Sequence, residues 1–439
     1  MSPSVGFISL GCAKNQIDCE QMMFLLRQAG YRIAPAPEAA DLVVVNTCGF
    51  IDAAKSEAIE AIIRAGQWKA EGRVKKILVT GCLAQRYQQE ILKELPEVDG
   101  VLGTGSYYDV VSAADQVMRG RPVTEFGSID AEVPETARVV TTPKHYAYIK
   151  IAEGCDNRCA YCVIPSLRGR YRSRRMEDIL SEAQGLAARG TRELIVVAQD
   201  TSRYGIDLYR KRMLAPLLRE LCKIDGLHWI RVHYTYPDEL TDELIDIIAR
   251  EPKLVKYLDI PIQHVNDEIL RRMNRRGNKA YLEQLFPKLR SRIPGLVIRT
   301  SLIAGLPGEG EAEFDELCAF LRKHRLERVG AFAFSPEEGT PAAEMDYPDA
   351  EVANRRAEHI ARLQSEILDD WNEAHFDQTM EVLIDDWDGA FYSGRTYADS
   401  PGIDGTVRFR AEREHRIGEF VNVTVLGAED GELIGREAE

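Results

Sequence analysis

The sequence of 439 residues lacks any long hydrophobic run. No segment reaches the roughly 18 consecutive apolar residues that a membrane-spanning helix needs, so we expect no membrane span. The first residues, MSPSVGFISLGC, contain no basic region followed by an apolar stretch, so we expect no secretory signal. The 45% of hydrophobic and 29% of charged residues are typical of a folded protein with a substantial core. We therefore expect a cytoplasmic protein of two or three domains.

Cysteine is also scarce, and its number is odd. The nine cysteines are widely scattered, which argues against a framework of disulfides. In a reducing compartment, clustered cysteines are more often metal ligands or redox groups. Basic residues are in the minority, because 56 Lys and Arg against 70 Asp and Glu give a formal net charge of −14. Such an acidic chain is poorly suited to indiscriminate nucleic-acid binding and favours a basic partner.

Three segments differ in their sequence pattern and predict an α/β protein. Residues 4–126 alternate β-rich runs with helical patterns, which predicts a parallel α/β domain, and residues 127–143 indicate a linker. Residues 144–378 repeat a strand–helix unit six times and end in a helical stretch, which predicts a partial TIM-like (β/α)6 barrel with its active site at the strand carboxyl ends. Residues 379–439 have short alternating runs and Gly-rich turns, typical of a small β-barrel.

The most specific motif is GCDNRCAYC at residues 154–162. It places Cys155, Cys159 and Cys162 at CxxxCxxC spacing, in a loop after the first expected barrel strand. Thiolates suit iron–sulfur clusters, which normally take four protein ligands. With three ligands one iron stays open, and it can bind the amino and carboxylate groups of S-adenosylmethionine. A zinc site or chance spacing is the alternative, and the expected barrel argues against it.

The loop and the partial barrel together resemble the radical S-adenosylmethionine (radical-SAM) superfamily. This resemblance implies that Tyr161, the aromatic residue before the last cysteine, lies near the adenine. It also implies that SLIAGLPGE at 301–309, with Gly305 and Glu309, helps to bind the nucleoside. Taken alone, GLPGE is only a Gly/Pro turn. We expect no catalytic side chain beyond the cluster ligands.

Three further cysteines follow expected strands in the first segment. Cys12, Cys48 and Cys82 stand in SLGCAKN, VNTCGF and VTGCLA, each directly after a strand-like run. Open α/β sheets bind ligands outside the carboxyl ends of their strands, so these thiols are expected to converge and hold a second cluster. The alternative is that they are small packing residues. Packing is our interpretation of the cysteines in helical patterns, Cys19, Cys222 and Cys318.

Over essentially its whole length the chain resembles the methylthiotransferase family. The resemblance implies that the last segment is a TRAM domain and that both clusters are of the [4Fe-4S] type. It also implies the attachment of a methylthio group to an unactivated carbon, with one S-adenosylmethionine as methyl donor and another as radical source. Cys12, Cys48 and Cys82 are then expected to hold the cluster that carries the sulfur.

Two branches of that family compete. One modifies an adenosine beside the anticodon of transfer RNA, and the other the β-carbon of an aspartate of ribosomal protein S twelve. SLGCAKNQIDCE, KIAEGCDNRCAYCVIPSLRGRYRSR, AQDTSRYG (198–205) and YLDIPIQH (257–264) resemble the second branch, and Asp200 and His264 differ from the first. The last segment has 14 acidic and 6 basic residues, a formal charge of −8, which favours a basic ribosomal protein over RNA.

Other features leave alternatives open. RGRYRSRR (168–175) is interpreted either as a contact with cofactor, substrate or ribosomal RNA, or as a solvated loop with salt bridges. His145, His233 and His264 are candidates for proton transfer or structural residues. We expect a monomer that uses an electron donor and a sulfur source and acts on the free protein or the small ribosomal subunit. A non-catalytic iron–sulfur ribosome-binding factor is the hypothesis from another class.

Overall fold

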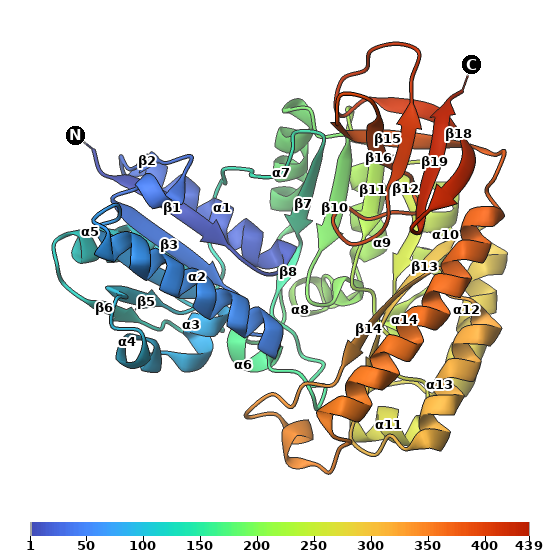
Figure 1. The fold of residues 1–439 in the computed structure, drawn as a ribbon, viewed down its shortest axis with the longest axis horizontal. Helices are drawn as coiled ribbons and strands as arrows, with labels where there is room; N and C mark the ends of the chain where they lie inside the picture. Colours follow the sequence, from blue (N-terminus) through green and yellow to red (C-terminus); the bar gives the residue numbers. More distant parts are fainter. Residues whose placement is uncertain (1, 439) are drawn as a thin grey trace.

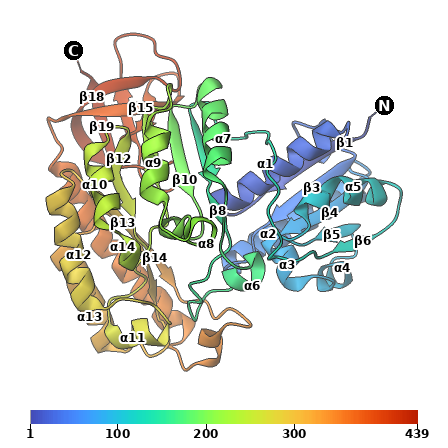
Figure 2. The same cartoon turned by 180° about the vertical axis from the view of Figure 1, so that it is seen from behind.

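The computed structural model describes residues 2–438, so Glu439, the last residue of the predicted third segment, lies outside the described residues. The chain forms three parts (Figure 1): an N-terminal sheet with helices, a larger half-open barrel, and a small C-terminal barrel. The same parts are seen from behind in Figure 2. No helix in the described range is both long enough and apolar enough to cross a bilayer.

The N-terminal part is a six-stranded parallel sheet in the order β2-β1-β3-β4-β5-β6. Its elements are β1 (Ser4–Ser9), α1 (Ala13–Gln28), β2 (Arg32–Ile33), β3 (Leu42–Thr47), α2 (Asp52–Ala70), β4 (Lys76–Gly81), α3 (Cys82–Tyr87), α4 (Glu90–Glu94), β5 (Gly100–Leu102), α5 (Val110–Met118) and β6 (Val123–Glu125). β3 reads LVVVNT and is buried at every residue, as expected for a parallel strand covered on both faces. One face packs against α1 and α5, and the other against α2 and α3.

The middle part confirms the predicted partial barrel, with six parallel strands in the order β14-β13-β12-β11-β10-β7. Its elements are β7 (Tyr146–Lys150), β8 (Ala152–Glu153), α6 (Ile164–Arg168), β9 (Arg172–Ser173), α7 (Met176–Ala188), β10 (Glu193–Val197), α8 (Ile206–Tyr209), α9 (Leu214–Cys222), β11 (Trp229–Val232), α10 (Asp242–Arg250), β12 (Leu254–Asp259), α11 (Asp267–Arg272), α12 (Lys279–Arg292), β13 (Val297–Ala304), α13 (Glu311–His324), β14 (Arg328–Ala333) and α14 (Ala350–Glu373).

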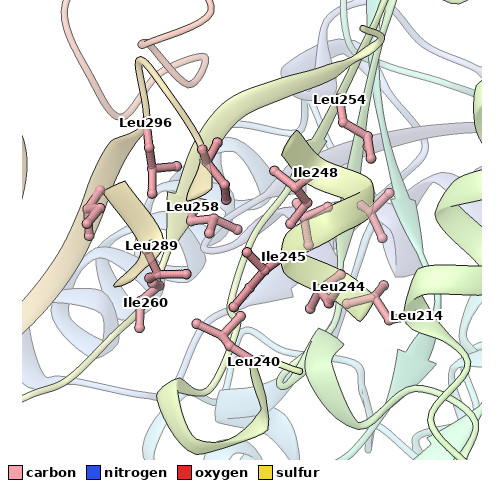
Figure 3. Close-up of a cluster of buried hydrophobic side chains, with 14 of the residues drawn as sticks. Leu214, Leu240, Leu244, Ile245, Ile248, Leu254, Leu258, Ile260, Leu289 and Leu296 are labelled. Atoms are coloured by element: carbon pink, nitrogen blue, oxygen red, sulfur yellow. The ribbon is translucent and has the colours of Figure 1, made fainter. Parts of the chain in front are cut away.

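Helix α10 illustrates how the barrel core forms. Its sequence DELIDIIAR places apolar residues on one face, and the Thr241 side chain caps its first turn by accepting a hydrogen bond from the Leu244 amide at 3.2 Å. Ile245 and Ile248 are buried and belong to the same apolar cluster as Leu258 of β12 (Figure 3). Burying such side chains is the main favourable contribution to folding.

The C-terminal part is a closed five-stranded barrel in the order β15-β16-β17-β19-β18. Its strands are β15 (Thr379–Trp387), β16 (Tyr392–Arg395), β17 (Val407–Arg410), β18 (Phe420–Glu429) and β19 (Glu432–Glu437). β17 alternates buried Val407 and Phe409 with exposed arginines, which places one face inside the barrel. The predicted small β-barrel is confirmed.

The C-terminal barrel covers the amino ends of the central strands. Glu193, the first residue of β10, forms an ion pair with Arg395 of the C-terminal barrel. It also pairs with Arg231 of β11, whose Nε lies 2.8 Å from Glu193 Oε1. His145, which precedes β7, lies 2.7 Å from Asp385 of β15. This contact is therefore at the end of the barrel opposite to the expected active site.

The loop at residues 395–404, which we call the plug loop, extends from the C-terminal barrel into the central barrel and is largely buried apart from Gly402 and Ile403. Ser400 Oγ lies 3.0 Å from His233 Nε2, and Asp404 accepts a hydrogen bond from Tyr257 at 2.7 Å. Burial, reinforced by nearby cations, lowers the pKa of His233 well below its usual value, so this ring is neutral. His145 and His233 thus both have structural contacts with the C-terminal part of the chain.

Three acidic residues of the last segment face inward and pair with the central barrel: Asp385, Asp399 and Asp404. The formal charge of −8 therefore overstates the charge that this domain presents to a partner. The acidic residues on its surface are the ones that remain available to attract a basic partner.

We expect acid to weaken the contact around Glu193. Burial alone would raise the pKa of this carboxyl, but Arg395 and Arg231 hold it below its ordinary value of about 4.3. A lowered pKa contributes stability that is complete above the ordinary value and is lost as the pH falls through the lowered one. The denaturant midpoint should therefore fall below about pH 4. A Glu193→Gln variant should show a shallower decline, and an equally steep one would contradict this explanation.

Candidate cluster-binding site

The predicted motif at 154–162 forms a loop beside the carboxyl end of β7, as expected. Gly154 has φ +79°, and a Cβ there would lie 2.0 Å from the carbonyl oxygen of Arg170, so only glycine fits. The Cys155 amide donates a hydrogen bond to the Gly169 carbonyl at 3.1 Å. This hydrogen bond attaches the cysteine loop to the segment that directly follows α6. Burial raises the pKa of Cys155 to about 11, so metal binding must displace its proton.

Two side chains that sequence reasoning missed lie beside these thiols. Tyr236 Oη is 3.1 Å from Cys159 Sγ. Arg275 is buried and donates to Tyr236 Oη at 2.5 Å and to Tyr161 Oη at 3.3 Å. A buried guanidinium here offsets the negative charge that bound thiolates bring. Neither residue belongs to a recognisable motif, so no local signal identifies them.

Tyr161 and the GLPGE turn, both of which the family resemblance assigns to the nucleoside, lie close together. Tyr161 packs in one apolar cluster with Leu306 of the turn, next to Cys159 and Cys162. Gly305 has φ +80°, and a Cβ there would lie 2.5 Å from Ala353 of α14.

Glu309 is buried and closes the same turn. Its Oε1 accepts from the Gly305 amide at 2.9 Å and from Arg356 of α14 at 3.0 Å. Its Oε2 lies 3.3 Å from His264 Nε2, but the alignment is unfavourable and neither atom has a hydrogen-bond partner among residues 2–438. These contacts explain Gly305 and Glu309 structurally, and their contact with a nucleoside stays a prediction.

The second set of cysteines lies at the carboxyl edge of the N-terminal sheet. Cys48 and Cys82 directly follow β3 and β4, and Cys12 lies shortly after the end of β1. These three strands are adjacent and parallel. A Cβ on Gly11 would lie 2.8 Å from Cys48 Cβ, and a Cβ on Gly81 would lie 2.4 Å from the backbone of the neighbouring strand. Glycine beside the cysteines thus lets the three loops approach closely. The two sets are neighbours, because Cys82 packs in one cluster with residues of the loop after Cys162.

Arg168 connects the two parts. This residue, first in the arginine-rich stretch, is 4% exposed, and its Nε and Nη2 each lie 3.3 Å from Cys82 Sγ. It also pairs with Asp18 of α1, which in turn accepts from Lys150 at 2.5 Å. Because the next residue, Gly169, binds the Cys155 amide, adjacent residues contact both cysteine sets.

The remaining arginines of that stretch match the salt-bridge interpretation. They pair with carboxylates of the linker and of α7: Arg170 and Arg172 with Asp130, Arg174 with Glu135 and Glu182, and Arg175 with Glu177 and Asp178. The arginine-rich stretch therefore has two roles. Arg168 is buried beside Cys82, and the other arginines form ion pairs with the linker and with α7.

The donor chemistry of the two sets suits iron–sulfur clusters, because each set offers three cysteine thiols. Among residues 2–438, no three Cys, His, Asp or Glu side chains converge tightly enough to hold one metal ion. A four-iron cluster offers a separate iron to each thiolate, so its ligands stand further apart. Three thiols in each set, with a buried arginine beside each, fit a cluster that keeps one iron open.

Comparison with known proteins identifies the family. The models "Uncharacterized protein family UPF0004", "Radical SAM superfamily" and "TRAM domain" match residues 4–103, 149–321 and 378–437. "Ribosomal protein uS12 methylthiotransferase RimO" of Thermoanaerobacter sp. (strain X514) is 47% identical over 435 residues, which cover 98% of this chain and 99% of that relative. The protein of the same name from Symbiobacterium thermophilum is 46% identical, with 99% and 91% covered. The chain belongs to the RimO family.

A solved structure supports the fold. The radical S-adenosylmethionine methyltransferase TsrM from Kitasatospora setae has a TM-score of 0.59 and 17% identity, and covers 78% of this chain and 77% of its own. At that identity the likeness concerns the fold alone. Family membership confirms the predicted methylthiotransferase family and the order of its three domains. The exact domain boundaries and the assigned ligands stay predictions.

Proposed function

We propose that this protein is a radical-SAM methylthiotransferase that places a methylthio group on the β-carbon of an aspartate of ribosomal protein uS12. The observation that carries the proposal is the full-length identity of 47% to a relative of that name. Two adjacent sets of three cysteines, one in each of two domains, agree with it. The proposed ligands are Cys12, Cys48 and Cys82 for one cluster and Cys155, Cys159 and Cys162 for the other.

When bound, two [4Fe-4S] clusters and S-adenosylmethionine supply the oxidant that an unactivated C–H bond requires and the sulfur and methyl group that replace the hydrogen. The chain holds and shields this site. Arg275 and Tyr236 fix Cys159 from the barrel side, and Arg168 neutralises charge at Cys82. Lys55 of α2 contacts Glu337 after β14 at 3.0 Å and keeps the N-terminal domain against the barrel.

The substrate class agrees with the charge of the surface. Exposed acidic residues outnumber exposed arginines on the C-terminal barrel: Glu381, Asp386, Asp388, Glu412, Glu414, Glu419, Glu429, Asp430 and Glu432 against Arg408, Arg410, Arg413, Arg416 and Arg436. They favour a basic ribosomal protein over a polyanionic transfer RNA. Because this barrel lies at the amino ends of the central strands, it would hold a part of the partner remote from the modified aspartate. We further propose a cytoplasmic monomer that depends on a separate electron donor and a sulfur source.

Mass spectrometry of ribosomal proteins from cells with and without the gene tests the proposal. We expect uS12 to carry the mass of a methylthio group in place of one hydrogen, on one aspartate, and to lose it on deletion. If uS12 were unchanged and a transfer-RNA adenosine lost its methylthio group, the substrate would be wrong. Anaerobic incubation with dithionite and S-adenosylmethionine must also yield 5′-deoxyadenosine, because a non-catalytic ribosome-binding factor yields none.

A further inference from the structure

Lys14 occupies an unusual position between the two cysteine sets. It lies in the first turn of α1, two residues after Cys12, and is only 8% exposed. Its Nζ is 3.5 Å from the centroid of the Tyr234 ring. Tyr234 follows β11 at the open mouth of the central barrel, with φ +58°, a conformation that is costly for a non-glycine residue. The ammonium group is therefore held where the N-terminal sheet edge meets the barrel mouth.

This cation has no acidic partner within the described part of the chain. No carboxylate oxygen of residues 2–438 lies within 4.0 Å of Lys14 Nζ, whereas the buried Lys150 contacts two carboxylates, at 2.5 and 2.7 Å. The nearby Asp259 is occupied, because its Oδ1 accepts from Arg299 at 3.0 Å and its Oδ2 from the Tyr234 amide at 3.1 Å. Tyr234, Cys12 and Asp259 stabilise the charged form of this ammonium group, but no carboxylate contacts it directly. A buried cation without a carboxylate in contact is suited to an anion that arrives with a ligand.

We infer that Lys14 binds the side-chain carboxylate of the target aspartate and so makes the enzyme select aspartate. The inference rests on the proposed function. In aspartate the β-carbon is bonded directly to the carboxylate carbon, so a cation that holds the carboxylate also fixes the position of the C–H bond to be broken. Lys14 is two residues from one cysteine set and faces the barrel mouth that carries the other. The bound β-carbon is then placed between the two.

The test compares wild-type protein with Lys14→Met and Lys14→Arg variants. Lys93→Met is the matched control, because Lys93 is in the same domain and its side chain is 82% exposed. Each loaded protein is given uS12 and a uS12 variant with asparagine in place of the target aspartate. The measurements are kcat/KM for methylthiolation and the Kd for both substrates by fluorescence anisotropy. Iron content and 5′-deoxyadenosine release without uS12 show whether each variant is loaded.

We expect wild type and Lys93→Met to prefer aspartate over asparagine at least about 10-fold in Kd, the effect of one hydrogen-bonded charge. Lys14→Met should lose this preference, and Lys14→Arg should keep part of it because the charge remains. If a loaded Lys14→Met protein kept the wild-type preference, the inference would be overturned while the proposed function stood. A change only in iron content would assign Lys14 to the cysteines and also overturn it. If wild type modified neither substrate, the proposed function would fall, and the inference with it.

Discussion

Replacing Cys48 with alanine is expected to stop methylthiolation of uS12 while S-adenosylmethionine cleavage continues. Cys48 belongs to the N-terminal set, whereas the CxxxCxxC loop belongs to the central barrel and keeps its three thiols. Replacing a residue that hydrogen-bonds to a metal ligand typically lowers metal affinity or activity about 10- to 100-fold. Replacing the ligand itself should therefore reduce methylthiolation by more than that. The measurement is methylthiolated uS12 and 5′-deoxyadenosine in the same anaerobic reaction.

Cys159→Ala is the opposite case and should abolish both products, because it removes a ligand from the barrel loop. Cys222→Ala is the control: this cysteine ends α9, packs against the barrel core and belongs to neither set. Full methylthiolation by Cys48→Ala protein would refute the idea of two clusters. Loss of both products in Cys222→Ala protein would show that the assay reports folding and not ligation.

Replacing Arg168 with methionine is expected to destabilise the protein by about 3–5 kcal/mol, the usual effect of removing one partner from a buried ion pair. The side chain of Arg168 is 4% exposed, and its loss leaves Asp18 and Glu153 to share Lys150. Burial raises the pKa of Glu153, but Lys150 and Arg168 together lower it to about 2, so this carboxylate stays charged near neutral pH. Denaturant unfolding followed by near-UV circular dichroism gives the change.

Arg170→Met provides the matched control for Arg168→Met. Its side chain is 79% exposed, and its contact with Asp130 is 3.7 Å long, so the change should stay below about 1 kcal/mol. Equal destabilisation by both substitutions would show that the buried network has no special importance. Separate unfolding of the N-terminal domain in Arg168→Met protein would show that the residue mainly joins the two domains.

Much of the fold was predictable because its signals are local. Alternating apolar strands and amphipathic helices predict both parallel sheets, and the thiols stand at strand ends, so Cys12, Cys48 and Cys82 could be grouped from their position alone. The contacts of Arg275, Tyr236 and Lys14 could not, because they join segments that lie far apart in the chain and follow no spacing rule. The stretch with Arg168 was recognised, but sequence alone could not decide which arginine is buried, since that depends on how α1 docks against the barrel.

The plug loop bears on how the C-terminal barrel can be exchanged between relatives. Its side chains complete the interior of the central barrel through His233, Tyr257 and Arg231. A chimera that joins a foreign C-terminal barrel at residue 378 would therefore also replace the lining of the recipient's central barrel. Swaps designed to change the choice of partner should keep residues 395–404 of the recipient and graft only the outer strands, so that altered recognition is not confused with a collapsed interior.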